Sequence, residues 1–233
     1  MAQRYKRLTY SLIVLVGFLT VCPVLMLFFG SLSEGLTAFG SFTVDKYIQA
    51  YTDPDLFKVL FQTALFVFGA SSLSTGLALF LAYISTRTDM PFRFLFKIIP
   101  VIPMMIPHIL FSVSWVMLLN PSNGILNLLL RQIFGIEGSV FNIYSLPGMI
   151  MVEGLLDLPI AYLIIAPAMS SFDVTLEESS RVCGADSFRT LFKITLPVLR
   201  PAILAAFILC IIRGLASFAV PSAIGMKIGR AHV

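Results

Sequence analysis

Five apolar stretches in the chain are each long enough to cross a lipid bilayer as a helix. They lie near residues 10–30, 59–84, 95–119, 145–169 and 201–222. A membrane-spanning helix needs about 20 mostly apolar residues, and the chain as a whole is 58% hydrophobic but only 12% charged. A soluble domain would carry about 25% charged residues. The sequence therefore predicts an all-α integral membrane protein with about five spans and no separate soluble domain.

Prolines and turn residues predict irregular features within and between these spans. The third stretch contains the sequence PVIPMMIP, and we expect its helix to be kinked or partly unwound at Pro100, Pro103 and Pro107. The connecting segments 41–57 and 120–142 are mildly amphipathic and contain turn signals. They predict short helices at the outer face of the membrane.

The basic residues predict which connections face the cytoplasm, because cytoplasmic loops of membrane proteins carry an excess of Lys and Arg. If the N-terminus is cytoplasmic, only Lys46, Lys58 and Arg131 are outside. The basic residues that are then inside are Arg4, Lys6, Arg7, Arg87, Arg93, Lys97, Arg181, Arg189, Lys193 and Arg200. This bias predicts a cytoplasmic N-terminus, and it places the segment 170–200 in the cytoplasm.

The placement of charges and cysteines argues against several other classes of protein. The formal net charge is +4, but the basic residues flank apolar runs and form no stripe, so lipid and not nucleic acid is the expected neighbour. Cys22, Cys183 and Cys210 have no CxxC spacing, which predicts neither a disulfide framework nor a zinc site. His108 has no nearby carboxylate or cysteine, so helix packing is expected of it and not metal ligation.

The segment "LEESSRVCGADSFRTLFKITLP" (176–197) is far more polar than its surroundings. Asp173, or Thr175 together with Glu178 as a capping box, can begin one helix, and Gly184 is typical of a left-handed helix end. Asp186 or Ser187 can then begin a second, amphipathic helix that Pro197 breaks or bends. The face expected of that second helix consists of Phe188, Leu191, Phe192, Thr195 and Leu199. The sequence thus predicts two short helices hinged on a glycine, and we call residues 173–197 the elbow.

The elbow resembles the cytoplasmic loop of the membrane subunits of ABC transporters, specifically those of binding-protein-dependent importers. In that family the loop has the form E-A-A, three residues, G, nine residues, I, one residue, L-P. The fixed positions and their spacings agree, with serine in place of both alanines: Glu178, Ser179, Ser180, Gly184, Ile194, Leu196 and Pro197.

The resemblance implies that the elbow docks on a cytoplasmic ATPase and couples ATP hydrolysis to movement of the spans. It implies a type I ABC-importer transmembrane domain, residues 1–227, in the bacterial inner membrane. The implied partners are an ABC ATPase dimer, a periplasmic or lipoprotein substrate-binding protein, and a second permease half or subunit. The chain itself would be non-catalytic and hold no cofactor, with ATP bound to the partner. The residues implied in ATPase coupling are Glu177, Glu178, Ser179, Ser180, Gly184, Ala185, Ile194, Leu196 and Pro197.

Three further segments resemble the amino-terminal half of ferric-iron-type permeases. They are RTDMPFR, FNIYSLPGMIMVEGL and TLPVLRPAILAAF. Relatives of those permeases carry other small anions or polyamines, so the resemblance implies import of ferric iron or a related small solute. In the ferric-type pattern, acidic residues follow an arginine where this chain has Ala216 and Ala219. Arg213 therefore does not identify the solute.

Three charged residues fall inside predicted spans. Glu153 and Asp157 are four residues apart and share a helix face, and Arg213 lies in the last span. An unpaired charge at the centre of a membrane helix costs about 2.5–3.5 kcal/mol, so we expect partners or water. The three residues either line a translocation path or form a structural ion pair between two helices.

The C-terminal end has two peculiarities. The resembling permeases have six spans per half, so the resemblance implies that this chain is truncated before the sixth. The final IGRAHV (228–233) resembles the translation of a common sequencing adapter, which excludes His232 from functional reasoning.

Two other classes of function remain open on the sequence. One is a membrane scaffold or sensor that docks a cytoplasmic partner through 173–197. The other is an intramembrane enzyme that uses Glu153, Asp157 and His108, although their spacing resembles no nucleophile–base arrangement. Association with an ATPase through the elbow would separate the permease from both.

Overall fold

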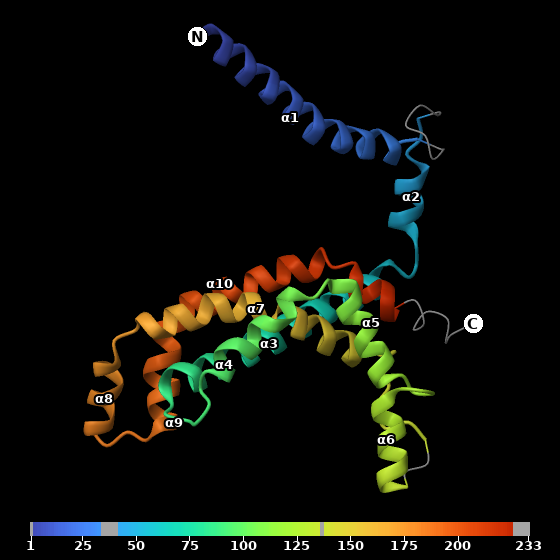
Figure 1. Ribbon diagram of the computed structural model, residues 1–233. Helices are drawn as coiled ribbons and strands as arrows, with labels where there is room; N and C mark the ends of the chain where they lie inside the picture. The colour runs from blue at the N-terminus through green and yellow to red at the C-terminus, as the bar shows by residue number, and fades with distance from the viewer. Residues whose placement is uncertain (1, 34–41, 136–137, 226–233) are drawn as a thin grey trace. The chain divides into compact units, whose positions relative to one another are not determined.

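The computed structural model of the chain describes residues 2–33, 42–135 and 138–225 (Figure 1). These residues form helices and their connections, with one isolated antiparallel bridge between Ser33 and Phe42. The predicted all-α architecture is therefore confirmed. The chain divides into two compact units, Met1–Leu60 and Phe61–Val233, and each is described by itself. The predicted adapter segment 228–233 lies outside the described residues.

The first unit contains the first predicted span and a short helix. Helix α1 (Ala2–Ser31) includes the apolar stretch Thr9–Ser31, whose most apolar window has a mean hydropathy of 2.8 and is 0% buried. Within the first unit, no other element buries this window. Helix α2 (Asp45–Thr52) lies within the segment where a short helix was predicted, and the hydroxyls of Ser31 and Tyr47 bond at 2.7 Å.

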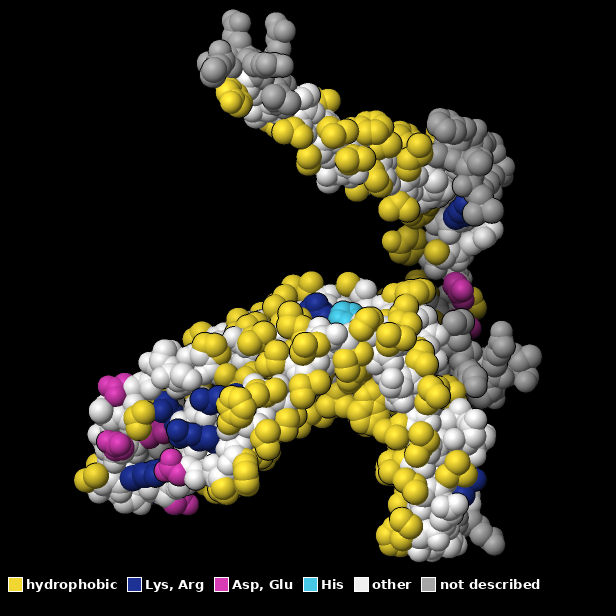
Figure 2. Space-filling model, viewed as in Figure 1, with side chains coloured by type: hydrophobic (Ala, Val, Ile, Leu, Met, Phe, Trp, Pro, Cys, Tyr) yellow, Lys and Arg dark blue, Asp and Glu magenta, His cyan; other side chains and the backbone are white. Residues whose placement is uncertain are grey.

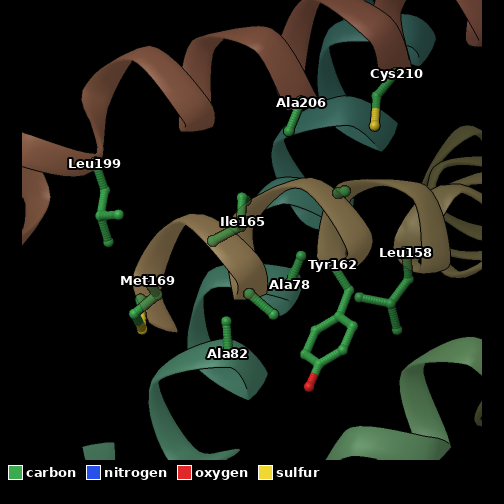
Figure 3. Close-up of a cluster of buried hydrophobic side chains, with 11 residues drawn as sticks. Ala78, Ala82, Leu158, Tyr162, Ile165, Met169, Leu199, Ala206 and Cys210 are labelled. Atoms are coloured by element: carbon green, nitrogen blue, oxygen red, sulfur yellow. The ribbon is translucent and has the colours of Figure 1, made fainter. Parts of the chain in front are cut away.

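Three long helices form the core of the second unit: α3 (Leu56–Arg87), α7 (Leu146–Ser171) and α10 (Leu196–Leu215). Figure 1 shows them side by side, and in Figure 3 side chains from all three meet in one buried cluster. In α7, 67% of the most apolar window is buried, against 39% in α3. Helix α7 is therefore the central helix, and its neighbours shield it from lipid.

Small side chains let α3 approach α7 closely. Ala70, Ser74, Ala78 and Ala82 recur at every fourth residue along α3, and each is at most 1% exposed. A Cβ added to Gly154 of α7 would lie only 3.1 Å from the carbonyl oxygen of Ala70. Helices in membranes associate through such small residues, because lipid supplies no hydrophobic force that drives helices together.

The proline-rich span is broken, as its sequence predicts. It consists of α4 (Leu95–Ile98), the 3-10 helix η1 (Ile99–Met105) and α5 (His108–Leu119). The two parts of this span meet at an angle of 106°. Pro103 and Pro107 have no N–H to donate, and their close spacing removes donors from consecutive turns, which favours a break in this stretch. With the bent pair counted as one span, the described residues contain up to five spans.

Helix α6 (Ile125–Phe134) confirms the short helix expected within 120–142. It is held by Asn127, which is 1% exposed. The Asn127 amide donates to the carbonyl oxygens of Asn120 and Phe141, each at 2.9 Å, and its oxygen accepts from the Phe141 N–H at 3.0 Å. One buried side chain therefore fastens the chain on both sides of α6.

We expect Asn127→Leu to loosen this end of the second unit. The substitution keeps the branching at Cγ but leaves the Phe141 N–H and carbonyl without their partner. Such a loss costs about 1–3 kcal/mol. Hydrogen exchange at the Phe141 amide should accelerate accordingly, whereas substitution of the exposed Asn123 by leucine should not change it. Unchanged exchange in Asn127→Leu would contradict the role given to Asn127.

The last helix begins and ends earlier than the predicted span 201–222. Helix α10 is α-helical from Leu196, where it continues the helical segment before it, and Pro197 lies in its first turn. It ends at Leu215, and the chain then continues into the short π-helical segment η3 (Pro221–Gly225). Arg213, expected near the middle of a span, consequently lies in the last turn of α10.

Candidate functional site

The elbow forms the two short helices that the sequence predicts. They are α8 (Val174–Val182) and α9 (Ser187–Thr190). The Asp173 carboxylate caps α8 by accepting from the Thr175 N–H at 3.0 Å, and this bond lowers the pKa of Asp173. Asp186 caps α9 by accepting from the Arg189 N–H at 2.8 Å. Of the predicted alternatives, Asp173 and Asp186 are the residues that cap these helices.

Gly184 makes the turn between the two helices. Its φ is +87°, in the left-handed region that side chains other than glycine rarely adopt. The Gly184 N–H donates to the carbonyl of Arg181 at 2.9 Å, and the Ala185 N–H donates to that of Ser180 at 3.1 Å. These bonds satisfy carbonyls at the end of α8, so the predicted glycine hinge is confirmed.

One part of the elbow prediction is corrected. The sequence predicts that Pro197 breaks or bends the second helix, and it does not break it, because α9, the π-helical segment η2 (Leu191–Thr195) and α10 follow one another without a gap. A π turn holds more residues than an α turn, so faces before and after η2 do not line up. The predicted single face accordingly divides in two. Thr195 and Leu199 are buried, whereas Phe188 is 74% exposed.

The exposed part of that face carries an aromatic pair. The rings of Phe188 and Phe192 stack with centroids 6.4 Å apart and an interplanar angle of 11°. Val182, at the end of α8, is 89% exposed. On the face shown in Figure 2, charged side chains gather around α8 and α9, and hydrophobic ones cover most of the rest of the second unit. The elbow is thus a polar end with large apolar side chains left uncovered.

The residues predicted to couple the elbow to an ATPase differ in exposure. Those that face outward are Glu178, Ser179, Gly184 and Pro197. Those that are half-buried are Ser180, Ala185, Ile194 and Leu196. Glu177 differs from all of them because it is only 6% exposed. The two adjacent glutamates therefore have different surroundings, and only Glu178 is accessible to a partner.

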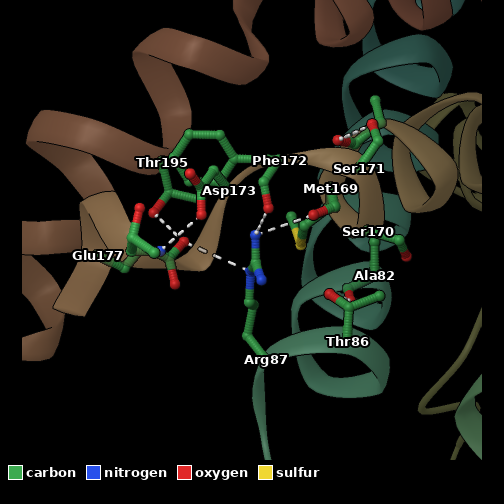
Figure 4. Close-up of polar contacts among 12 residues, drawn as sticks. Ala82, Thr86, Arg87, Met169, Ser170, Ser171, Phe172, Asp173, Glu177 and Thr195 are labelled. Carbon is green, nitrogen blue, oxygen red and sulfur yellow. Dashed lines mark hydrogen bonds and ion pairs between the residues drawn. The ribbon is translucent and has the colours of Figure 1, made fainter.

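The partners of Glu177 were missed by the sequence analysis. Its Oε1 accepts from the Thr195 hydroxyl at 2.7 Å and lies 3.5 Å from the Arg87 Nε, as Figure 4 shows. The sequence identifies Arg87 only as one of the basic residues expected on the cytoplasmic side, at the end of a span. The partners of its long side chain depend on how distant helices pack, and residue spacing along the chain does not indicate that packing.

The three charged residues of the spans meet between α7 and α10. The Arg213 Nε donates to the Asp157 Oδ1 at 2.8 Å, and the Ser217 hydroxyl donates to the Glu153 Oε2 at 2.7 Å. The sequence left open whether these residues line a translocation path or form an ion pair between helices, and the structure contains an ion pair of Arg213 with Asp157. Asp157 is 1% exposed, whereas 34% of the Arg213 side chain is exposed.

This polar cluster borders a cavity of about 510 Å³. The cavity wall is formed by the start of α5, by α7 and by the chain from Arg213 to Ala219. The lining residues are Pro107, His108, Ile109, Glu153, Leu156, Arg213, Ala216, Ser217, Phe218 and Ala219. Within the described ranges, no three His, Cys, Asp or Glu side chains are grouped so as to hold a metal ion. The cavity can offer a guanidinium, a carboxylate, an imidazole and one hydroxyl to a polar solute.

The arrangement of apolar spans, a broken helix and a capped polar elbow defines an integral membrane protein of the ABC-importer permease class. Residues 74–231 match the family described as "Binding-protein-dependent transport system inner membrane component", and the chain belongs to that family. The resemblance drawn from the elbow sequence is thereby confirmed.

Curated relatives carry several different solutes according to their names. Over 216 residues the chain is 26% identical to the ferric transport system permease protein FbpB of Actinobacillus pleuropneumoniae, covering 92% of this chain and 30% of that protein. Over 172 residues it is 27% identical to the molybdenum transport system permease protein ModB of Escherichia coli K12, covering 72% and 70%. The chain thus spans about a third of the length of the ferric permeases that it matches.

Solved structures show the same fold. A bacterial ABC transporter that imports alginate has 18% identity and a TM-score of 0.66, with 95% of this chain and 82% of that chain covered. The alginate transporter in complex with a pentasaccharide-bound periplasmic protein gives a TM-score of 0.64 at 18% identity, with 89% and 70% covered. The predicted fold class, an ABC-importer transmembrane domain, is therefore confirmed.

Proposed function

We propose that the chain is a membrane-spanning permease subunit of an ATP-driven solute importer. The observation that carries this proposal is the elbow: a rigid, doubly capped pair of helices with an aromatic pair uncovered at the polar end of the second unit. Exposed apolar groups of this size mark a docking surface. The occupant that we assign is a cytoplasmic ABC ATPase, which is the partner implied by the match of the elbow to the importer loop.

The proposed arrangement in the membrane follows from the same assignment. If the ATPase binds the elbow, the elbow is cytoplasmic, and the excess of basic residues gives the N-terminus the same side. Helix α6, at the other end of the second unit, would then face the periplasm, where a substrate-binding protein delivers solute. A second permease half or subunit would complete the path, in the bacterial inner membrane.

The part of the translocation path that we assign to this chain is the polar cluster together with its cavity. Arg213, Glu153 and Ser217 border the cavity, and the start of α5 in the broken span also lines it. Discontinuous helices beside a polar site are the usual form of solute sites in transporters. Ferric iron is the first solute to test because two of the relatives are ferric transport permeases. Molybdate and sulfate, named by other relatives, come next.

Co-purification with the ATPase tests the proposed function. The full-length chain is expressed with the ATPase encoded beside its gene and isolated in detergent, and uptake of ferric iron, molybdate and sulfate is measured in proteoliposomes. We expect the ATPase to co-purify and Phe188→Asp to remove it, because the charge enters an exposed apolar contact without disturbing the core. Ile133→Asp, a matched change at a residue of α6 that is 69% exposed, should leave the ATPase bound. Capture of another cytoplasmic protein in place of the ATPase would favour the scaffold or sensor alternative and refute the permease.

A further inference from the structure

Arg87 lies where three helical elements meet. It is the last residue of α3, and its side chain is only 7% exposed. Its Nη2 donates to the carbonyl oxygens of Met169 at 2.9 Å and Phe172 at 3.0 Å, and its guanidinium carbon is 5.4 Å from the centroid of the Phe172 ring. These carbonyls belong to the end of α7, where a helix has no internal donors left for them. Arg87 therefore fastens the end of α3 to the end of α7.

The same guanidinium reaches the elbow through Glu177. The carboxylate of Glu177, on α8, lies beside the Arg87 Nε and also accepts a bond from the Thr195 hydroxyl of η2 (Figure 4). Only 8% of the Glu177 side chain is exposed. A continuous chain of polar contacts thus runs from α3 through Arg87 and Glu177 to the segment that leads into α10.

We propose that Arg87 is the positioning residue through which movement of the elbow reaches α3. This inference rests on the proposed function, in which an ATPase moves the elbow. Helices α7 and α10 are joined to the elbow by the chain itself, at Phe172 and at η2. Helix α3 has no such covalent connection, so it can follow the elbow only through side-chain contacts. The buried ion pair of Arg87 with Glu177 is such a contact, because it joins the end of α3 to α8.

The Arg87–Glu177 pair is held by charge in a buried place. The Nε–Oε1 separation is 3.5 Å, and the buried Arg87 Nε makes no hydrogen bond. A displacement of α8 away from α3 would separate two buried charges. The pair thus resists separation of α3 from the elbow more strongly than an exposed pair could.

The test compares variants that remove the link with variants that retain the charge balance. Arg87→Met alone would leave Glu177 charged and buried, so its failure to fold would be uninformative. The informative variant is the double substitution Arg87→Met with Glu177→Gln, which is neutral and similar in volume. Arg93→Met is the matched control, because Arg93 pairs with Asp89 at 3.9 Å in an exposed position close by.

The measurement uses spin labels on the complete transporter with its ATPase and binding protein. One label occupies the native exposed Cys183 and the other a cysteine introduced by Met90→Cys, in a background with Cys22→Ser and Cys210→Ser. With and without ATP, the distance between the labels should stay the same in the parent protein and in Arg93→Met. In the double variant it should change with nucleotide, and uptake per ATP hydrolysed should fall about tenfold, within the usual range of coupling between sites.

Two results would overturn the inference, and they are distinguishable. If the double variant keeps its ATPase and matches the parent both in label distance and in uptake per ATP, Arg87 transmits nothing and the proposed function stands. If the parent protein binds no ATPase, the proposed function fails and this inference fails with it.

Discussion

Arg213→Met should destabilise the second unit by about 2.5–3.5 kcal/mol, the cost of an unpaired charge inside a membrane helix. The substitution keeps most of the apolar contacts of the side chain but leaves the Asp157 carboxylate, 1% exposed, without its cation. Thermal unfolding in detergent, followed by far-UV circular dichroism, measures the loss.

Two further variants show whether the charge is the cause. Combining Arg213→Met with Asp157→Asn removes both charges and should restore most of the lost stability. Arg200→Met, which removes an exposed arginine near the start of α10, should have little effect. If the double variant is as unstable as Arg213→Met, packing and not charge explains the result, and the ion pair is not what joins α7 to α10.

Gly184→Val should remove the ATPase from the purified complex while the spans stay folded. An L-residue forced into the left-handed conformation costs about 1–2 kcal/mol, and a β-branched one is a clear outlier there. A difference of this size changes the population of a conformation by a factor of about 5–30. No atom lies within 4 Å of a Cβ added at this glycine, so the effect comes from the backbone and not from a clash. Quantitative co-purification measures it.

Gly135→Val is the matched control for this prediction. Gly135 ends α6 with a φ of +64° and also has nothing within 4 Å of an added Cβ. It should therefore suffer similar backbone strain far from the elbow and keep its ATPase. Gly184→Asn should be tolerated, because asparagine adopts left-handed conformations more readily than other side chains do. Full ATPase binding by Gly184→Val would show that docking does not need the turn.

Features that depend on neighbours in the sequence could be predicted. Asp173, Asp186 and Gly184 act through bonds that reach only a few residues along the chain, so their roles are readable from residue type and spacing. The break of the third span is equally local, because three prolines lie within eight residues there, whereas α7 stays continuous through the widely spaced Pro159 and Pro167. The pairing of Asp157 with Arg213 was within reach because a buried charge must find a partner and few were available.

Features that depend on packing between distant segments could not be predicted. The sequence LEES offers two glutamates side by side, and nothing local decides that Glu177 turns inward to Arg87 and Thr195 while Glu178 faces outward. The split of the expected face at Phe188 and Thr195 has a similar origin. A prediction from the spacing of apolar residues assumes a regular α-helix. The π-helical segment η2 changes the number of residues per turn, and no residue pattern in the sequence indicates it.

The segment η2 also determines the direction in which α10 points its side chains. Each residue of an α-helix advances the chain by about 100° around the axis, since one turn takes 3.6 residues. If the residues of η2 adopted a regular α-helix without loss of a residue, everything downstream would therefore rotate by roughly that angle. Arg213 would then point away from Asp157, although the change lies at the opposite end of the helix. The surplus residue of one irregular turn sets the rotational alignment between the elbow and the intramembrane charges.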